Sequence, residues 1–145
     1  MSITVRQARS GDQDALALVG ATTFLESYAG VVDGGAIIRH CAERHTPEVY
    51  GQALETRSHA LWLAEMAPGA APVGYLHLTP PDLPVETRPD DLEIKRIYVL
   101  ASLHRSGLGR RFIAEAVNHA RAEGASRLLL GVYQGNERAL AFYER

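Results

Sequence analysis

The period of the hydrophobic pattern changes early in the chain. Residues 3–9 ("ITVRQAR") alternate between apolar and polar side chains, which predicts a strand. Residues 16–23 then carry apolar positions at helical spacing, which predicts a helix that continues into "TFLESY". Ser10 and Gln13 have the spacing of a capping box, so the start of this helix is predicted beside Ser10.

The middle of the chain predicts two shorter helices and a hairpin. Apolar residues at 37, 38 and 41 predict a second helix, and Thr46 followed by Pro47 has the pattern of an N-cap and first helical residue. Residues 59–66 and 73–78 have strand patterns on either side of a turn rich in Gly and Pro, so they are expected to pair. Residues 79–91 hold four prolines and predict an irregular loop.

The last third of the chain predicts two strands with a helix between them, and then a further helix. Residues 92–99 predict a strand whose odd-numbered side chains place Glu93 on the same face as Ile97 and Val99. The apolar stripe of the helix that follows is formed by Leu108, Phe112, Ala116 and Ala120, with Gly124 as its C-cap residue. Residues 126–133 form a nearly continuous apolar run, as in a strand covered on both faces, and residues 136–145 predict a helix.

This order of elements predicts one mixed α/β domain over residues 1–145, with a right-handed crossover between two parallel strands. Its 46% of hydrophobic residues are enough for a core, and a net charge of -2 argues against a general nucleic-acid binder. No run approaches the roughly 20 apolar residues of a membrane span, and the amino terminus lacks a signal-peptide pattern. With a single cysteine, Cys41, an internal disulfide is excluded, so a cytoplasmic location is expected.

The stretch "HRSGLGRRF", residues 104–112, places two glycines and three arginines at the start of a predicted helix. A helix amino terminus offers unpaired N–H groups that suit a phosphate, and glycines let a ligand approach the backbone. A Walker loop would need Lys and then Ser or Thr after the last glycine, where Arg110 and Arg111 stand. A dinucleotide fingerprint would need glycine where Phe112 stands, and a helix start with solvated arginines remains the alternative.

The longer stretch "IYVLASLHRSGLGRRF" resembles motif A of the GCN5-related N-acetyltransferase (GNAT) superfamily. The resemblance implies that the backbone of Ile97, Tyr98 and Val99 lies beside the pantetheine arm of acetyl-CoA. It also implies a pyrophosphate loop made of Arg105, Ser106, Gly107, Leu108, Gly109 and Arg110. His104 stands where members of this superfamily usually have Gln or Arg.

A second stretch, "GVYQGNERALAFYER", is similar to motif B of the same superfamily. The similarity implies that Asn136 contacts the cofactor and that Tyr143 lies near the thioester sulfur. Without it, Asn136 would be interpreted as a helix cap and Tyr143 as a half-buried aromatic. The resemblance covers residues 61–145 and implies a centrally splayed β-sheet flanked by helices, with the final strands of the fold missing from this chain.

The implied reaction is the attack of an amine on the acetyl thioester of acetyl-CoA. Glu93 is the candidate general base. The alternatives are that Glu93 only contacts a cross-strand partner or solvent, or that a water chain acts as the base. The N–H of Val99 is the candidate donor to the oxyanion, and Tyr143 is the candidate general acid towards the departing thiolate.

The resemblance also implies that the first predicted helices and their connecting loop wall the acceptor site, where Phe24, Glu26 and Tyr28 are candidate substrate-binding residues. An amphipathic helix with Glu26 in water is the alternative. A small-molecule amine is expected, and a softer likeness to bacterial polyamine-acetylating members makes a polyamine one candidate. A protein or peptide amine, or an acetyl-CoA-binding module without turnover, are the alternatives. The six histidines lack a metal-binding spacing, so no metal, nucleic acid or membrane partner is expected, and a homodimer stays open.

Overall fold

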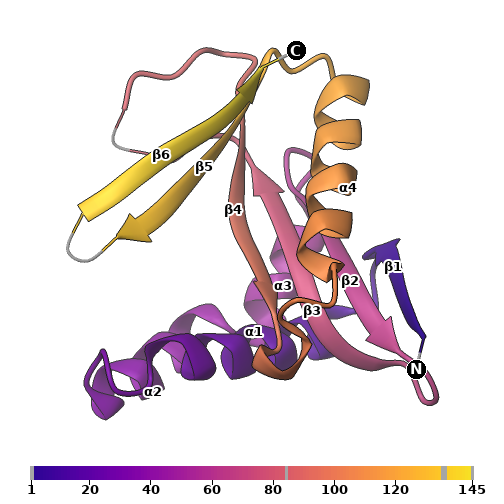
Figure 1. Ribbon diagram of the computed structural model, residues 1–145, viewed down its shortest axis with the longest axis vertical. Helices are drawn as coiled ribbons and strands as arrows, with labels where there is room; N and C mark the ends of the chain where they lie inside the picture. Colours follow the sequence, from indigo (N-terminus) through magenta and orange to yellow (C-terminus); the bar gives the residue numbers. More distant parts are fainter. Residues whose placement is uncertain (1, 84, 135–136, 145) are drawn as a thin grey trace.

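The structure is a computed structural model that describes residues 2–83, 85–134 and 137–144, with side chains described as far as residue 131. Within these residues six strands form one sheet in chain order (Figure 1). Their bounds are β1 (Ile3–Gln7), β2 (Ala60–Met66), β3 (Ala71–Thr79), β4 (Leu92–Val99), β5 (Arg127–Gln134) and β6 (Glu137–Glu144). Neighbouring strands are antiparallel except for β4 and β5, which are parallel.

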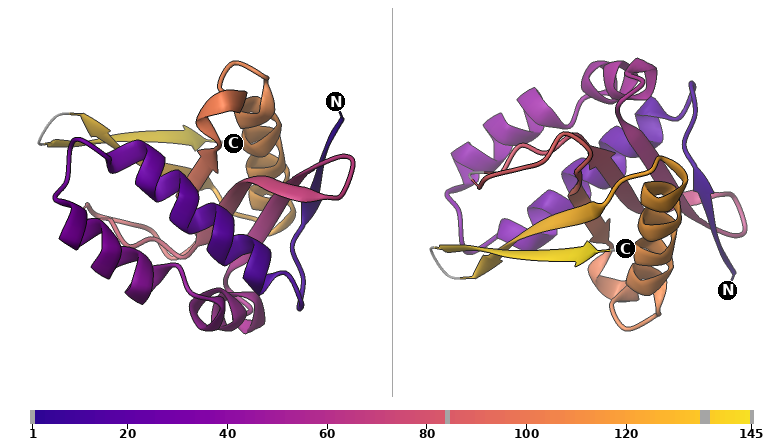
Figure 2. Two further views of the ribbon diagram at one scale, coloured as in Figure 1. Left: turned by 90° about the horizontal axis from the view of Figure 1, so that it is seen from below. Right: turned by 90° about the horizontal axis from the view of Figure 1, so that it is seen from above.

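Helices cover both faces of the sheet. One face carries α1 (Gln13–Tyr28), α2 (Gly34–Arg44) and α3 (Pro47–Glu55), and the other carries α4 (Leu108–Ala122), the crossover between β4 and β5 (Figure 2). A short 3₁₀ helix, η1 (Ala101–Leu103), lies between β4 and α4. The prediction of a mixed α/β fold is therefore confirmed. Within the described part of the chain, none of the helices combines the length and apolarity needed to cross a bilayer.

Two hydrophobic cores follow from the alternation of side chains along the central strands. Leu61, Leu63 and Tyr75 pack with α1 and α3, whereas Trp62 and Leu76 pack with Phe112 and the rest of the apolar stripe of α4. Each of these strands is buried on both faces, which explains its high proportion of apolar residues.

The helix starts were predicted with mixed success. Thr46 caps α3 as predicted, with its hydroxyl accepting a hydrogen bond from the Val49 N–H at 3.2 Å. The capping box at Ser10 is wrong, because α1 begins one residue after Asp12. The Gln13 side chain instead accepts a hydrogen bond from the Gly11 N–H at 2.9 Å.

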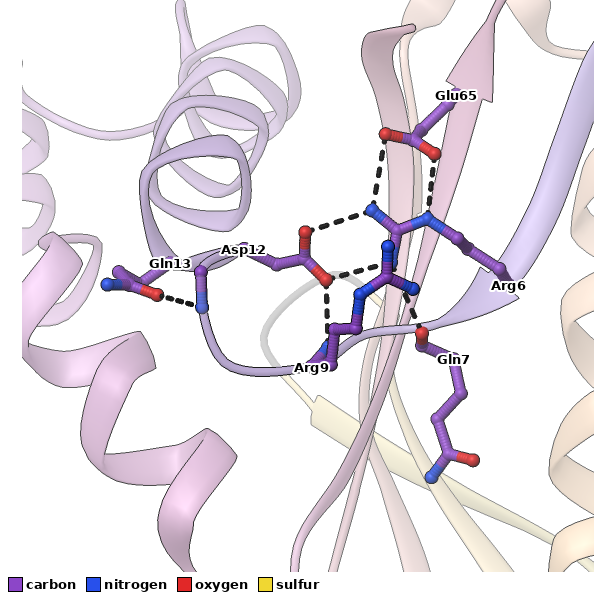
Figure 3. A network of polar contacts seen from close by, with 7 residues as sticks. Arg6, Gln7, Arg9, Asp12, Gln13 and Glu65 are labelled. Atoms are coloured by element: carbon purple, nitrogen blue, oxygen red, sulfur yellow. Dashed lines mark hydrogen bonds and ion pairs between the residues drawn. The ribbon is translucent and has the colours of Figure 1, made fainter.

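The Asp12 carboxylate connects the start of α1 to the sheet (Figure 3). It accepts hydrogen bonds from the Arg6 guanidinium at 2.8 and 2.9 Å and from the Arg9 N–H at 2.8 Å. Arg6 also contacts Glu65 of β2 at 2.8 Å, so one guanidinium joins β1, β2 and α1. The hydrogen bonds from Arg6 hold the pKa of Asp12 below its ordinary value.

The helix predicted over residues 136–145 is wrong: β6 occupies Glu137–Glu144 and pairs with β5 along the whole strand. Pairing with β5 therefore outweighs the local helix propensity of this segment. Without β6, β5 would be an apolar edge strand with a row of unpaired N–H and C=O groups.

The sheet splays apart in its centre. Pairing between β4 and β5 covers only Leu92–Ile94 and Leu128–Leu130, after which the two strands diverge (Figure 1). The paired end is fixed by Arg127, whose guanidinium makes two hydrogen bonds to the buried Asp91 carboxylate at 2.6 and 2.9 Å. The splayed sheet implied by the sequence is therefore confirmed, and the rest of β4 is left with a free edge facing β5.

Candidate active site

The loop between β4 and α4 contains two residues with left-handed backbone conformations. Arg105 has a φ of 74° and Gly107 has a φ of 86°, and α4 begins immediately after Gly107. The Ser106 hydroxyl accepts a hydrogen bond from the Leu108 N–H at 3.3 Å. The remaining N–H groups of the first turn have no intrahelical partner and carry the positive end of the helix dipole.

A cavity of about 350 Å³, here called the β4–α4 cavity, lies between this loop and the splayed part of β4. It is lined by Ile97, Val99, Leu103, His104, Arg105, Leu108 and Gly109. A Cβ built on Gly109 would have no protein atom within 4 Å, so the helix backbone is open to a ligand at this residue. Five of the predicted cofactor-binding residues therefore meet at one cavity.

The arginines of the loop differ in their contacts. Arg105 and Arg110 are exposed beside the start of α4. Arg111 instead donates a hydrogen bond to the Ile3 carbonyl at 2.9 Å, which holds it against β1. Arg105 and Arg110 are thus the arginines available to an anion at this helix terminus.

The backbone of β4 presents its free edge to the same region. The Leu100 N–H donates to the Val73 carbonyl of β3 at 3.0 Å, and successive residues of a strand direct their N–H groups to opposite edges. The N–H groups of Val99 and Ile97 therefore point away from β3, towards the edge that β5 has left. The His104 ring lies 3.2 Å from the Val99 carbonyl on this edge.

A β-bulge changes which residues of β4 share a face. His77 pairs with Arg96 and Leu78 pairs with Ile94, so Lys95 is an extra residue in β4. Ile94 and Ile97 consequently both pack towards α4, and the strict alternation expected from the sequence is interrupted.

The bulge moves Glu93 to the other face, so its predicted position beside Ile97 and Val99 is wrong. Glu93 pairs directly with Thr79, is only 3% exposed, and accepts a hydrogen bond from the Asp82 N–H at 2.7 Å. It is absent from the lining of the β4–α4 cavity. Its role as a general base stays a prediction.

A second cavity of about 210 Å³, here called the α1–β4 cavity, lies on the opposite face of β4. It is lined by Gly20, Thr23, Phe24, Tyr28, His40, His45, Tyr75, Lys95, Arg96 and Tyr98. Two of the three predicted substrate-binding residues, Phe24 and Tyr28, are among them. The third, Glu26, is exposed, and its carboxylate accepts a hydrogen bond from the Ala101 N–H at 3.0 Å, outside the cavity.

The polar groups of the α1–β4 cavity were not anticipated from the sequence. Lys95 and Arg96 bring two cations, and the described lining contains no carboxylate. His45 is 6% exposed, and its Nδ1 lies 2.7 Å from the Tyr50 hydroxyl. Its Nε2 is buried without a hydrogen-bond partner among the described residues. Burial, followed by the positive charge of Arg96, lowers the pKa of His45 to about 3, so this ring is neutral near pH 7.

The profile of the acetyltransferase (GNAT) family matches residues 32–145. The chain belongs to the GNAT acetyltransferase family. The match includes the whole of β4, residues 100–107 that join it to α4 (here called the glycine loop), and α4, and so covers the β4–α4 cavity.

Relatives of this GNAT chain agree with the assignment. A protein of Mycobacterium tuberculosis, named as a probable N-acetyltransferase, is 26% identical over 146 residues, covering 99% of this chain and 78% of the relative. An uncharacterised N-acetyltransferase of Lactobacillus delbrueckii subsp. lactis is 41% identical over 71 residues, 48% of this chain and 41% of that protein. The PaiA N-acetyltransferase of Thermoplasma acidophilum, solved with coenzyme A, superposes with a TM-score of 0.78. At 18% identity, covering 94% of this chain and 83% of the other, that likeness supports the fold.

The structure does not describe the side chains of the two residues assigned from motif B. Asn136 lies outside the described residues. The backbone of Tyr143 lies in β6 opposite Leu128, at the end of the sheet where β4 and β5 are still paired, and its side chain is outside the described part. The roles given to both residues in this GNAT chain stay predictions.

The packing of α1 against His45 gives a first testable prediction. A Cβ on Gly20 would lie 2.6 Å from both His45 Nδ1 and the Tyr50 hydroxyl, so Gly20→Ala must separate this pair. We expect the variant to lower the free energy of unfolding by about 1–3 kcal/mol, the usual cost of overpacking. In an open helical position, the same replacement would stabilise by about 0.5–1 kcal/mol.

Urea unfolding measures this difference, with Gly51→Ala in α3 as the matched control. A Cβ on Gly51 meets no atom within 4 Å, so the control is expected to gain stability. If both variants gained equally, His45 and Tyr50 would not be packed against α1 as described.

Proposed function

We propose that this protein transfers the acetyl group of acetyl-CoA to the primary amine of a small molecule held in the α1–β4 cavity. The observation that carries the proposal is the pair of cavities on opposite faces of β4. Both lie along the part of β4 that β5 has left, so groups bound on the two faces can meet at that free edge.

The β4–α4 cavity has the donors that a coenzyme A diphosphate requires. The amides at the start of α4 and the guanidinium groups of Arg105 and Arg110 provide positive charge, and the open backbone at Gly109 permits close approach. Ile97 and Val99 offer backbone N–H groups and apolar side chains to the pantetheine arm. When bound, acetyl-CoA supplies an activated thioester.

In the transfer, a bond forms from the amine nitrogen to the acetyl carbon and the carbon–sulfur bond breaks. The Val99 N–H, directed to the free edge of β4, is suited to donate to the acetyl oxygen as negative charge develops on it. An aliphatic amine has a pKa of about 10.4 and must lose a proton before it attacks. We assign that proton to Glu93 acting through water, because Glu93 lines neither cavity. The thiolate takes its proton from Tyr143, and the second proton lost by the nitrogen as the amide forms returns through water to the phenolate.

The size of the α1–β4 cavity supports a small acceptor. Its volume of about 210 Å³ is below the range of sites for drug-sized ligands, which begins at about 300 Å³. A protein amine would require an open groove, so a peptide acceptor is the second candidate and not the first.

The test combines binding and turnover. We expect calorimetry to detect acetyl-CoA binding, and a thiol-release assay with a panel of primary amines to show acceptor-dependent formation of coenzyme A. Binding without thiol release on any amine or peptide would support a non-catalytic acetyl-CoA-binding module. Release with lysine-containing peptides alone would support the protein acceptor.

A further inference from the structure

We infer that the preferred acceptor is a small primary amine that also carries a carboxylate, bound by Arg96 in the α1–β4 cavity. This inference rests on the proposed function and specifies its substrate class. A polyamine, which offers only cationic groups, would be a poor acceptor.

The first argument is the charge of the cavity. Arg96 is half-buried and, among the described residues, forms no ion pair with any carboxylate. Lys95 beside it adds a second positive charge, and the described lining has no acidic residue. A partly desolvated cation without a counterion favours an anionic ligand, and a guanidinium matches a carboxylate through two parallel hydrogen bonds.

The second argument is independent of charge. His45 is buried, lines the same cavity, and its Nε2 has no hydrogen-bond partner among the described residues. Such an atom is costly unless a ligand or water completes its hydrogen bond. Its position in the lining of the cavity points to a polar group of the acceptor as that partner.

The remaining walls suit the body of a small organic molecule. The rings of Phe24 and His40 are stacked with their centroids 3.9 Å apart, and Tyr28 lies 4.6 Å from Phe24. These rings are part of the cavity lining and offer it apolar surface, whereas Arg96 and His45 offer polar contact. The cations also favour the reactive form of the acceptor, because nearby positive charge lowers the pKa of an amine and so promotes loss of its proton.

The test compares amines that differ only in the carboxylate. The matched pairs are 4-aminobutyrate with n-butylamine and phenylalanine with phenethylamine, and spermidine represents the polyamines. In the thiol-release assay we expect at least a tenfold higher kcat/KM for the better carboxylate-bearing amine than for its matched partner. Spermidine is expected to be slower still.

Arg96→Met tests the residue while retaining an apolar stem. We expect it to abolish the preference within each pair, mainly by raising KM for the carboxylate-bearing amine, and to leave acetyl-CoA binding unchanged. Arg44→Met is the matched control, because Arg44 lies on a neighbouring cavity and not on the α1–β4 cavity. This control is expected to retain the preference.

The failures of the two proposals are distinguishable. Thiol release with butylamine or spermidine at equal or higher kcat/KM, insensitive to Arg96→Met, would overturn the carboxylate inference and leave the proposed function intact. If no acceptor released thiol, the proposed function would fail. Calorimetric binding of the two carboxylate-bearing amines to the coenzyme A-saturated protein, lost in Arg96→Met, would still support the inference. Equal binding of each carboxylate-bearing amine and its matched partner would overturn the carboxylate inference.

Discussion

Gly109→Val is expected to weaken acetyl-CoA binding by at least about 100-fold while leaving thermal unfolding nearly unchanged. The position of the Cβ is open, with no protein atom within 4 Å, so the valine side chain extends into the β4–α4 cavity instead of the core. There it separates a diphosphate from the first amides of α4. Hydrogen bonds to charged groups contribute about 1.5–3 kcal/mol each, so losing two of them corresponds to at least a hundredfold.

Calorimetry with acetyl-CoA and a thermal melt without ligand check this prediction together. The matched control is Gly51→Val, a helical glycine of α3 that is similarly half-buried and equally free of neighbours within 4 Å. Because glycine and valine have similar, low helix propensities, both variants are expected to keep the unfolding temperature of the parent protein. Undiminished acetyl-CoA binding by Gly109→Val would place the coenzyme elsewhere.

The second large effect is a loss of stability in mild acid, caused by His45 and His77. Both rings are at least 94% buried and neutral, and burial lowers the pKa of each to about 3. The unfolded chain binds a proton at each ring near pH 6.5, whereas the folded protein does not until about pH 3. Stability is therefore present above pH 6.5 and falls as the pH decreases through this window, by up to about 1.4 kcal/mol per pH unit for each ring.

Urea unfolding at a series of pH values between 6.5 and 4.5 measures this slope. Replacing one buried ring, as in His77→Leu, is expected to reduce the slope of unfolding free energy against pH by the contribution of about one proton. This reduction is expected whatever the effect of the substitution on stability at pH 7. Ile38→Leu, at an exposed position of α2 without a titratable side chain, is the control and should leave the slope unchanged. Equal slopes for His77→Leu and the parent protein would show that the His77 ring does not cause the loss of stability in acid.

The sequence was sufficient wherever a local signal dictates the structure. Thr46 and Pro47 mark the start of α3. The end of α4 was predicted to within one residue, because its C-cap is Glu123 and Gly124, with a φ of 76°, follows it. The glycine loop was located because Gly107 and Gly109 flank Leu108, the first residue of an apolar helical stripe. Each of these signals lies within a few neighbouring residues of the sequence.

The remaining features depend on partners distant in the sequence. The start of α1 depends on Asp12, which contacts Arg6 of β1. Residues 137–144 form β6 because they pair with β5 and so satisfy the backbone groups on its open edge. The bulge at Lys95 is visible only in the register with β3, so the faces of β4 could not be assigned from the alternation alone. Arg96 and His45 were missed for the same reason, since the cavity that unites them is assembled from α1, α2, β3 and β4.

The bulge at Lys95 separates two parts of the eight-residue strand β4. Beyond it, Ile97 and Val99 belong to the wall shared with α4, while Arg96 and Tyr98 belong to the wall shared with α1. Under the proposed function, substitutions at positions 96 and 98 would change the choice of acceptor and leave the contacts to acetyl-CoA unchanged. Beyond the bulge, regular alternation keeps the residues of each cavity on their own face of β4, so each set can change without the other.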